Sequence, residues 1–206
     1  MPLVVKSSYI EGGKGTLICE EDSNMEQPVV SGIMYDKNQA KITLKEVPDQ
    51  PGIAANIFGS IADAGLSVDM IIQNISAEGH TDLSFTLGRE ELNEAMVIME
   101  KVAKKIRAVN VSADSKIAKI SIVGAGMRSH SGVAARIFKT LSKEKINILM
   151  ISTSEIKVSC IIEQKHTKAA VNALHTAFGL DTKSTSIKSI EKKNSPARKK
   201  PKVNKK

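Results

Sequence analysis

Residues 51–71 read PGIAANIFGSIADAGLSVDMI, and residues 131–151 read SGVAARIFKTLSKEKINILMI, at a constant offset of 80 positions. Seven of the 21 aligned positions are identical, among them Gly52/Gly132 and Ile57/Ile137, and most of the others are conservative pairs. A match at one fixed offset without a gap indicates two copies of one supersecondary unit. Two copies form an interface with each other, and such interfaces often hold small ligands.

Hydrophobic periodicity around each copy predicts the order β-α-β-β-α, with a closing strand that is clear in the first copy and weak in the second. This order predicts an α+β chain of two ferredoxin-like units in tandem, each an antiparallel four-stranded sheet with its helices on one face. We expect the units to span residues 40–114 and 115–190. A further strand at 29–35 is a candidate to complete the second unit, and a D-K-N-Q turn is predicted to join it to the strand at 40–47.

The net charge of +8 is confined to the C-terminus. Residues 188–206 carry nine basic residues and one acid, so the rest of the chain holds 21 charges of each sign. We expect residues 191–206 to be a disordered tail. A nucleic-acid partner is not favoured, because no aromatic residue that could stack on bases is interleaved with the lysines.

The two cysteines are interpreted as reduced thiols of a cytoplasmic protein. No apolar run is long enough to cross a membrane, and no signal peptide is recognisable.

Sequence motifs for chemistry are missing. The segment IVGAGMRS resembles a dinucleotide-binding turn, but Ser129 occupies the third glycine position and the helix is expected to begin only near Ser131. The four histidines and two cysteines show no metal-ligand spacing, and no phosphate-binding loop is present. The sequence therefore predicts no catalytic residues, no metal and no cofactor.

The loops that lead into the first helix of each copy are better candidates for a site. Each delivers a glycine, Gly52 or Gly132, to the first helical turn. The unpaired N–H groups of a helix N-terminus bind carboxylates and phosphates, and glycine lets a ligand approach the backbone. An ordinary helix start explains the same residues, and duplication of the loop favours a ligand.

Four segments carry a family resemblance: EVPDQPGIAANIF (46–58), VDMIIQNIS (68–76), VGAGMRSHSGVAA (123–135) and ISTSEIKVS (151–159). Over residues 28–180 the chain closely resembles the regulatory half of aspartate kinase, a tandem pair of ACT domains. Residues 1–24 contain strands that resemble the end of the amino-acid-kinase catalytic domain.

The resemblance implies a regulatory subunit that performs no chemistry itself and senses lysine, threonine or both for feedback inhibition. It also implies a homodimer through the ACT domains and a full-length catalytic kinase chain as partner. Carried over position by position, the family's effector contacts fall on Asp49, Gly52, Ala54, Gln73, Asn74 and Ser76 in the first unit, and on Ala134, Asn147, Ile148, Ser154 and Glu155 in the second.

Two alternatives stay open at this point. The chain could be a free-standing amino-acid-binding regulator built from the same two units, or a fragment of a complete aspartate kinase. The strands in residues 1–24 argue against the free-standing regulator, which has no need of them.

Overall fold

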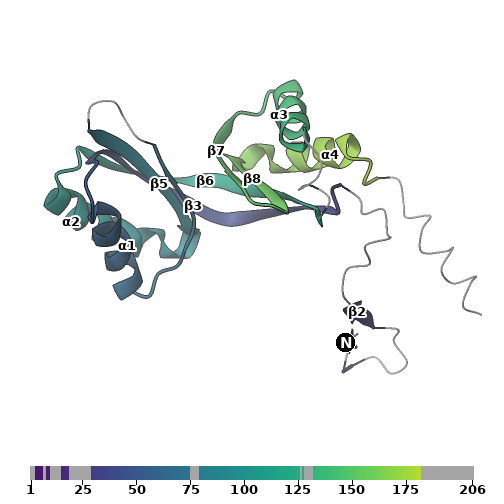
Figure 1. The fold of residues 1–206 in the computed structure, drawn as a ribbon, viewed down its shortest axis with the longest axis horizontal. Coiled ribbons are helices and arrows are strands. Elements are labelled where there is room, and N and C mark those ends of the chain that lie inside the picture. The colour runs from purple at the N-terminus through teal and green to yellow at the C-terminus, as the bar shows by residue number, and fades with distance from the viewer. Residues whose placement is uncertain are drawn as a thin grey trace, which may run out of the picture.

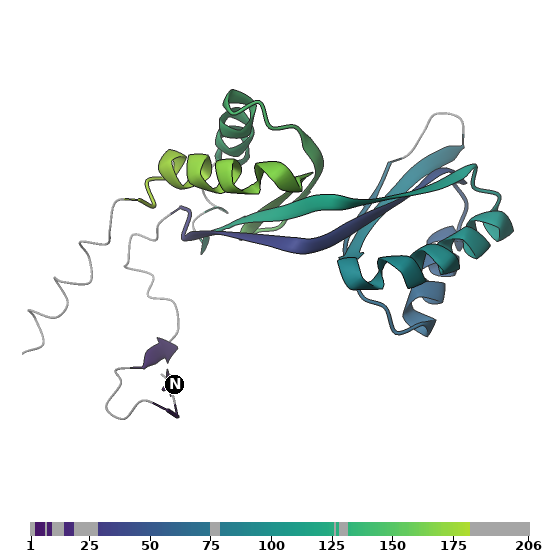
Figure 2. The ribbon, with the colours of Figure 1, turned by 180° about the vertical axis from the view of Figure 1, so that it is seen from behind.

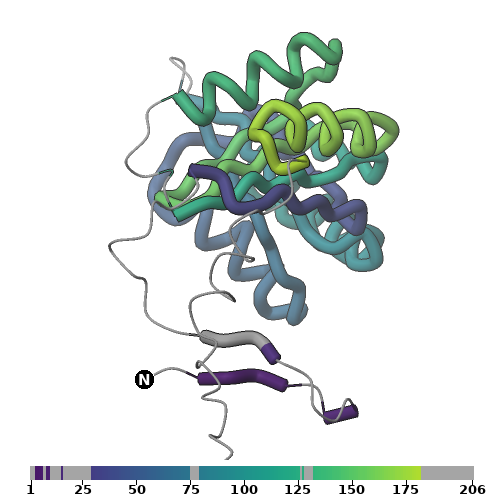
Figure 3. Tube along the Cα trace, turned by 90° about the vertical axis from the view of Figure 1, so that its right-hand side faces the viewer, coloured from purple at the N-terminus to yellow at the C-terminus, as the bar shows by residue number. Residues whose placement is uncertain are grey.

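The computed structural model describes residues 3–6, 8–9, 15–18, 29–74, 79–125, 127 and 132–181, with only the backbone for 16–18. The elements of the first repeat are β3 (Gly32–Pro48), α1 (Ile53–Asp63), β4 (Val68–Gln73), β5 (His80–Gly88), η1 (Arg89–Glu91), α2 (Leu92–Ile106) and β6 (Asn110–Val123). Those of the second are α3 (Val133–Lys143), β7 (Ile148–Thr153), β8 (Lys157–Glu163), η3 (Gln164–His166) and α4 (Thr167–Ala177). Strands β1 (Leu3–Val5) and β2 (Thr16–Ile18) pair in a separate two-stranded sheet (Figure 3).

The two repeats share one six-stranded antiparallel sheet in the order β4-β5-β3-β6-β8-β7. Strands β3 and β6 are long enough to serve both repeats, and the helix pairs α1/α2 and α3/α4 lie at opposite ends of these strands (Figures 1 and 2). We call the end with α1 and α2 the first unit and the end with α3 and α4 the second unit. Each unit has a four-stranded antiparallel arrangement covered by two helices, which confirms the predicted ferredoxin-like fold.

Each unit has its own hydrophobic core between its helices and the sheet. In the first unit Ile57 and Ile61 of α1 pack on Ile42 and Phe85, and Phe58 meets Phe85 edge to face with ring centroids 5.5 Å apart. The core of the second unit uses buried residues of the three equivalent elements, α3, β6 and β8: Ile137, Leu141, Ile120 and Cys160. The apolar stripes at helical spacing therefore face the sheet, as the sequence predicts.

The predicted D-K-N-Q turn is wrong, because Asp36 and Gln39 lie within the continuous strand β3. The pairing advances three residues in β3, from Asp36 to Gln39, against two in β6, from Lys119 to Ile117, so β3 carries a bulge. The Asp36 carboxylate accepts hydrogen bonds from the Asn38 N–H and the Gln39 side-chain amide, both at 2.8 Å. The side chains typical of a turn thus form the local hydrogen bonds of the bulge. Pairing with β6, which is distant in the sequence, keeps the strand extended on both sides of it.

Strand β6 is likewise continuous, although the sequence predicts the closing strand of the first copy (109–111) and the opening strand of the second (116–123) as separate elements. It has its own bulge, where Asp114 accepts a 2.8 Å hydrogen bond from the Lys116 N–H. Beyond the β3 bulge, residues Gly32–Asp36 pair with Lys119–Val123, and Val30 packs in the core of the second unit. The segment before the first repeat therefore contributes the strand next to β6 in the second unit.

Candidate functional site

Gly52 and Gly132 are the N-caps of α1 and α3, and both adopt the left-handed backbone conformation, with φ of 91° and 95°. A Cβ added at either glycine would meet no atom within 4 Å. Residues that carry a side chain rarely adopt this backbone conformation, so the turn itself requires glycine whether or not a ligand binds. The open space above both residues leaves room for a ligand to approach the backbone.

The first turns of α1 and α3 are alike in their electrostatics. Neither N-cap makes a side-chain capping hydrogen bond, and neither first turn contains an acidic residue. Asn56 N–H and Arg136 N–H donate to the carbonyls of Gly52 and Gly132, both at 2.9 Å, and start the helical ladder. The partial positive charge of each helix start is therefore not neutralised by a carboxylate of its own first turn.

The first unit brings most of its predicted residues to one end of the sheet. Asp49 follows β3, and its N–H donates to the Gly79 carbonyl at 2.9 Å, just before β5 begins. Asn74 follows β4, and its N–H donates to the Asp82 carbonyl in β5 at 3.3 Å. Only β5 lies between β3 and β4, and the residues in and just before β5 that accept from Asp49 and Asn74, Gly79 and Asp82, are three positions apart in the sequence.

Gly52 and Ala54 begin α1 directly after this end of β3, and Gln73 is the last residue of β4. The side chains of Asp49, Ala54, Gln73 and Asn74 are all exposed. Ser76 lies outside the described residues. The start of α1, a carboxylate and two amides thus lie exposed at this end of the first unit.

The second unit divides its predicted residues between its two ends. Ala134 lies in the first turn of α3, and Ser154 and Glu155 follow β7 at the same end. The Ser154 N–H donates to the Lys157 carbonyl at 2.7 Å, closing the turn into β8. Asn147 and Ile148 lie where β7 begins, so the whole length of that extended strand separates them from Ser154.

Asn147 and Ile148 line a cavity of about 410 Å³ instead. Its other lining residues are Phe138, Ser142, Lys145 and Ile146. Within one chain, the structure therefore does not bring the five predicted residues of the second unit together.

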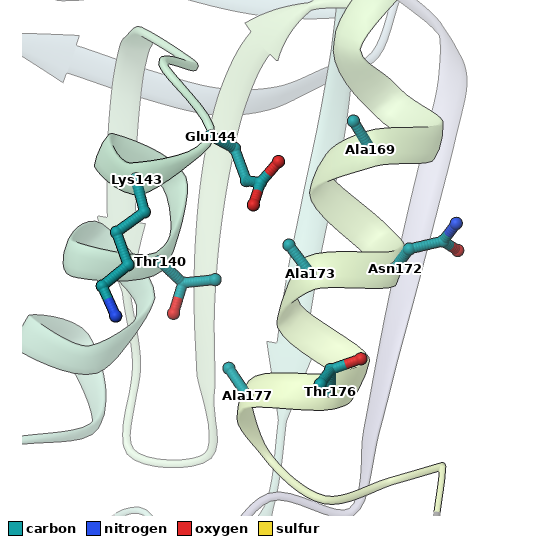
Figure 4. Close-up of a pocket in the computed structure, with 8 residues that line it drawn as sticks. All are labelled: Thr140, Lys143, Glu144, Ala169, Asn172, Ala173, Thr176 and Ala177. Atoms are coloured by element: carbon teal, nitrogen blue, oxygen red, sulfur yellow. The ribbon is translucent and has the colours of Figure 1, made fainter.

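A larger cavity of about 510 Å³ lies between α3 and α4 and contains none of the predicted residues (Figure 4). Ala169, Ala173 and Ala177 recur every four residues along the side of α4 that lines it, with Thr140, Lys143 and Glu144 opposite them on and just after α3. The positions of α2 that correspond to these alanines hold the bulkier Glu94, Ile98 and Val102. The alanine spacing was visible in the sequence, but alone it carries no chemistry.

Three further observations concern the chemistry of the described residues. They include no group of three His, Cys, Asp or Glu residues that could hold a metal ion. Burial raises the pKa of the Cys160 thiol to about 11, so at neutral pH it is protonated and a poor nucleophile. None of the helices in the described part of the chain is long and apolar enough to cross a membrane.

Comparison with known proteins identifies the family. The ACT domain model matches residues 45–102 and 120–178, one match in each unit. The aspartate kinase of Pseudomonas fluorescens is 54% identical over 182 residues, which are 88% of this chain and 44% of that protein. The chain is a regulatory ACT-domain region of the aspartate kinase family.

Solved structures of such regions superimpose on the fold. A structure of aspartokinase alpha and beta subunits has 51% identity and a TM-score of 0.69, with 73% of this chain covering 99% of that one. The ligand-free regulatory subunit of aspartate kinase from Thermus thermophilus has 39% identity, the same TM-score and the same coverage. The regulatory region described here spans less than half the length of the full aspartate kinases that it matches.

Proposed function

We propose that this regulatory ACT region binds lysine, threonine or both and acts as the feedback sensor of an aspartate kinase, in the biosynthesis of lysine, threonine and methionine. The observation that carries the proposal is that the start of α1 and the exposed side chains of Asp49, Gln73 and Asn74 lie at one end of the sheet in the first unit. An α-amino acid needs a site for a carboxylate and a site for an ammonium group, and this end of the unit offers both.

The N–H groups of the first turn of α1 would hold the ligand's carboxylate, because the helix dipole favours an anion there. Asp49 would balance an ammonium group, and the amides of Gln73 and Asn74 can both donate and accept hydrogen bonds.

The chain would act through partners and not through chemistry of its own. We propose that it forms a homodimer through its ACT units and associates with a full-length catalytic chain, as the names of the related regulatory and alpha/beta subunit structures suggest. The outer strands β4 and β7 support the dimer, because their outer edges have no partner strand in the six-stranded sheet and expose Ile71 and Ile151 at equivalent positions of the repeat.

A thermal-shift screen of the purified chain against all twenty amino acids tests the binding proposal. Lysine or threonine should raise the melting temperature in proportion to the logarithm of its concentration above Kd. If neither does so at concentrations about 100 times a millimolar Kd, the proposed site is wrong.

Two further assays test the partners and the missing activity. Sedimentation should give a dimeric mass at tens of micromolar chain. The isolated chain should form no aspartyl phosphate from ATP and aspartate, because phosphoryl transfer needs phosphate-binding and Mg²⁺-binding groups. A monomer in the first assay or product above background in the second would contradict the corresponding part of the proposal.

A further inference from the structure

The centre of the molecule, where the two units meet, is built from polar contacts that cross from one unit to the other. Arg89, the first residue of η1 in the first unit, donates from Nη2 to the Lys37 carbonyl in the β3 bulge at 2.5 Å and to Gln164 Oε1 at 3.2 Å. Gln164 is the first residue of η3 in the second unit, so it holds the position equivalent to Arg89. One guanidinium thus ties the first unit to both the bulge and the second unit.

A second contact crosses the junction between β4 and β6. Lys119 of β6 forms an ion pair with Asp69 of β4. The Lys119 side chain is only 19% exposed, so solvent screens this pair less than a fully exposed one.

An apolar cluster, which we call the junction core, fills the space beside these contacts. It consists of buried Met70, Ile117, Met150 and Ile161, with Ile72 and Leu149 packed against them. Met70 and Met150 are equivalent in the repeat, and the pairing of β4 and of β7 is irregular next to each of them. The edge strands of both units therefore bend where they reach the junction core.

Not every polar atom at the junction is satisfied. Gln39, paired with Ile117 in the sheet and 6% exposed, keeps Oε1 without a hydrogen-bond partner among the described residues, and the same holds for Arg89 Nε. A buried group without a partner costs free energy.

Strand β4 connects this junction to the candidate site. Gln73 ends β4 and Asn74 follows it, whereas Asp69 and Met70 lie near the start of the same strand. A ligand held by Gln73 and Asn74 would restrain the strand that carries the ion pair to Lys119 and one residue of the junction core.

We infer that the junction couples the two units, with β4 as the transmitting strand and Arg89 and the Asp69–Lys119 pair as the contacts that pass its displacement to β8, η3 and α4. The ligand-driven part of this inference rests on the proposed amino-acid site. The coupling itself is a property of the chain without ligand. Arg89, Asp69 and Lys119 are positioning residues, because none of them would touch the ligand.

Hydrogen–deuterium exchange on the full chain tests the ligand-driven part. In wild type, saturating L-lysine or L-threonine should slow exchange in α1 and β4 and also, severalfold, in residues 157–177 of the second unit. In the double variant Arg89→Ala/Asp69→Asn, the amino acid should still protect α1 and β4, with Kd within about threefold, but protection of 157–177 should be lost. Lys104→Ala, an exposed change on α2, is the matched control and should behave as wild type.

The conservative variant Arg89→Lys keeps a cation that can reach one of the two acceptors, so it should retain part of the protection. Equal protection of 157–177 in wild type and the double variant would overturn the inference. Protection of α1 and β4 in wild type that never reaches 157–177 would also overturn the ligand-driven part.

A measurement without ligand distinguishes an error in the proposed coupling from an error in the proposed amino-acid site. Pulsed exchange at increasing urea should show α1/β4 and β8/α4 losing protection at one common midpoint in wild type. In the double variant the two midpoints should separate by about 0.5 M or more. If no amino acid protects wild type but the midpoints separate as predicted, the proposed site fails and the coupling stands; a common midpoint in the double variant overturns the coupling.

Discussion

The two units have nearly the same backbone but present different side chains at their equivalent sheet ends. Gly52 and Gly132 share one left-handed conformation, and a 2.9 Å hydroxyl pair on the helix-free face, Thr43 with Ser84, recurs as Ser121 with Ser159. The ends of β4 and β7 differ: the first unit has Gln73 and Asn74 where the second has Thr153 and Ser154.

The two units therefore share a backbone scaffold but not the polar side chains that we propose to bind the ligand. A helix start without an acidic residue is common to both units, so it cannot by itself select a ligand. The amides and Asp49 are found together only in the first unit, which is why we assign the amino-acid site there.

The largest effect should come from truncating either core. Leu44→Ala in the first unit and Leu141→Ala in the second each remove a fully buried side chain and should lower the free energy of unfolding by about 2–5 kcal/mol. Because β3 and β6 run through both units, either change should move one common transition in guanidinium, followed by circular dichroism. Two transitions, of which each variant moves only one, would show that the units fold independently.

The dependence of stability on pH should distinguish the two cores. Cys160, which can ionise, occupies the place in the second unit that Phe85 has in the first. Burial raises the pKa of the Cys160 thiol from its usual 9.0 to about 11. Between these values the unfolded chain loses the proton first and binds fewer protons, so stability falls as pH rises from about 9 to 11, by roughly 2–3 kcal/mol in all.

Urea unfolding of wild type and Cys160→Ala across pH 8–11 measures this loss. Lysine and tyrosine ionisation affects both proteins alike, so only the difference in slope reports on Cys160. Parallel pH profiles would mean that the thiol is not buried as described.

Changes at the two N-cap glycines should cost the same in both units. Gly52→Val and Gly132→Val force a branched residue to positive φ and should each lower stability by about 1–2 kcal/mol. Gly52→Asn should cost less, because asparagine tolerates this conformation.

Thermal melts of these variants check the expectation. Gly59→Ala, inside α1 with open space around it, is the control and should stabilise by about 0.5–1 kcal/mol. A Gly52→Val protein as stable as wild type would contradict the left-handed turn. Since Val at position 52 strains the backbone, that substitution cannot by itself report on ligand binding.

Much of the fold could be predicted because the repeat and the hydrophobic periodicity are local signals. The periodicity predicts helices at 90–107 and 167–178 and strands at 66–74, 81–87 and 156–162. Helices α2 and α4 and strands β4, β5 and β8 lie within about two residues of these bounds, the ordinary precision of boundaries. The continuity of β3 could not be predicted, since Asp36–Gln39 have the composition of a turn and only pairing with Lys119 and Ile117, far away in the sequence, extends the strand.

The site was less predictable than the fold. Motif resemblance assigned Asn147 and Ser154 to the effector contacts of the second unit, but a motif does not record that the length of β7 separates them within one chain. Arg89 gave no signal either, because its partner Gln164 lies 75 residues away and nothing in the local sequence distinguishes it from a surface arginine.

The matched pair of variants Asn74→Ala and Ser154→Ala tests most directly whether the first unit holds the amino-acid-binding site. These residues are equivalent in the repeat, both are exposed, and each follows an edge strand. Isothermal calorimetry with L-lysine and L-threonine should show that Asn74→Ala weakens binding by about 1–3 kcal/mol, roughly 5- to 150-fold in Kd, if its amide is buried against the ligand. Ser154→Ala should leave Kd within about twofold. Binding that Ser154→Ala weakens and Asn74→Ala leaves unchanged would contradict the account.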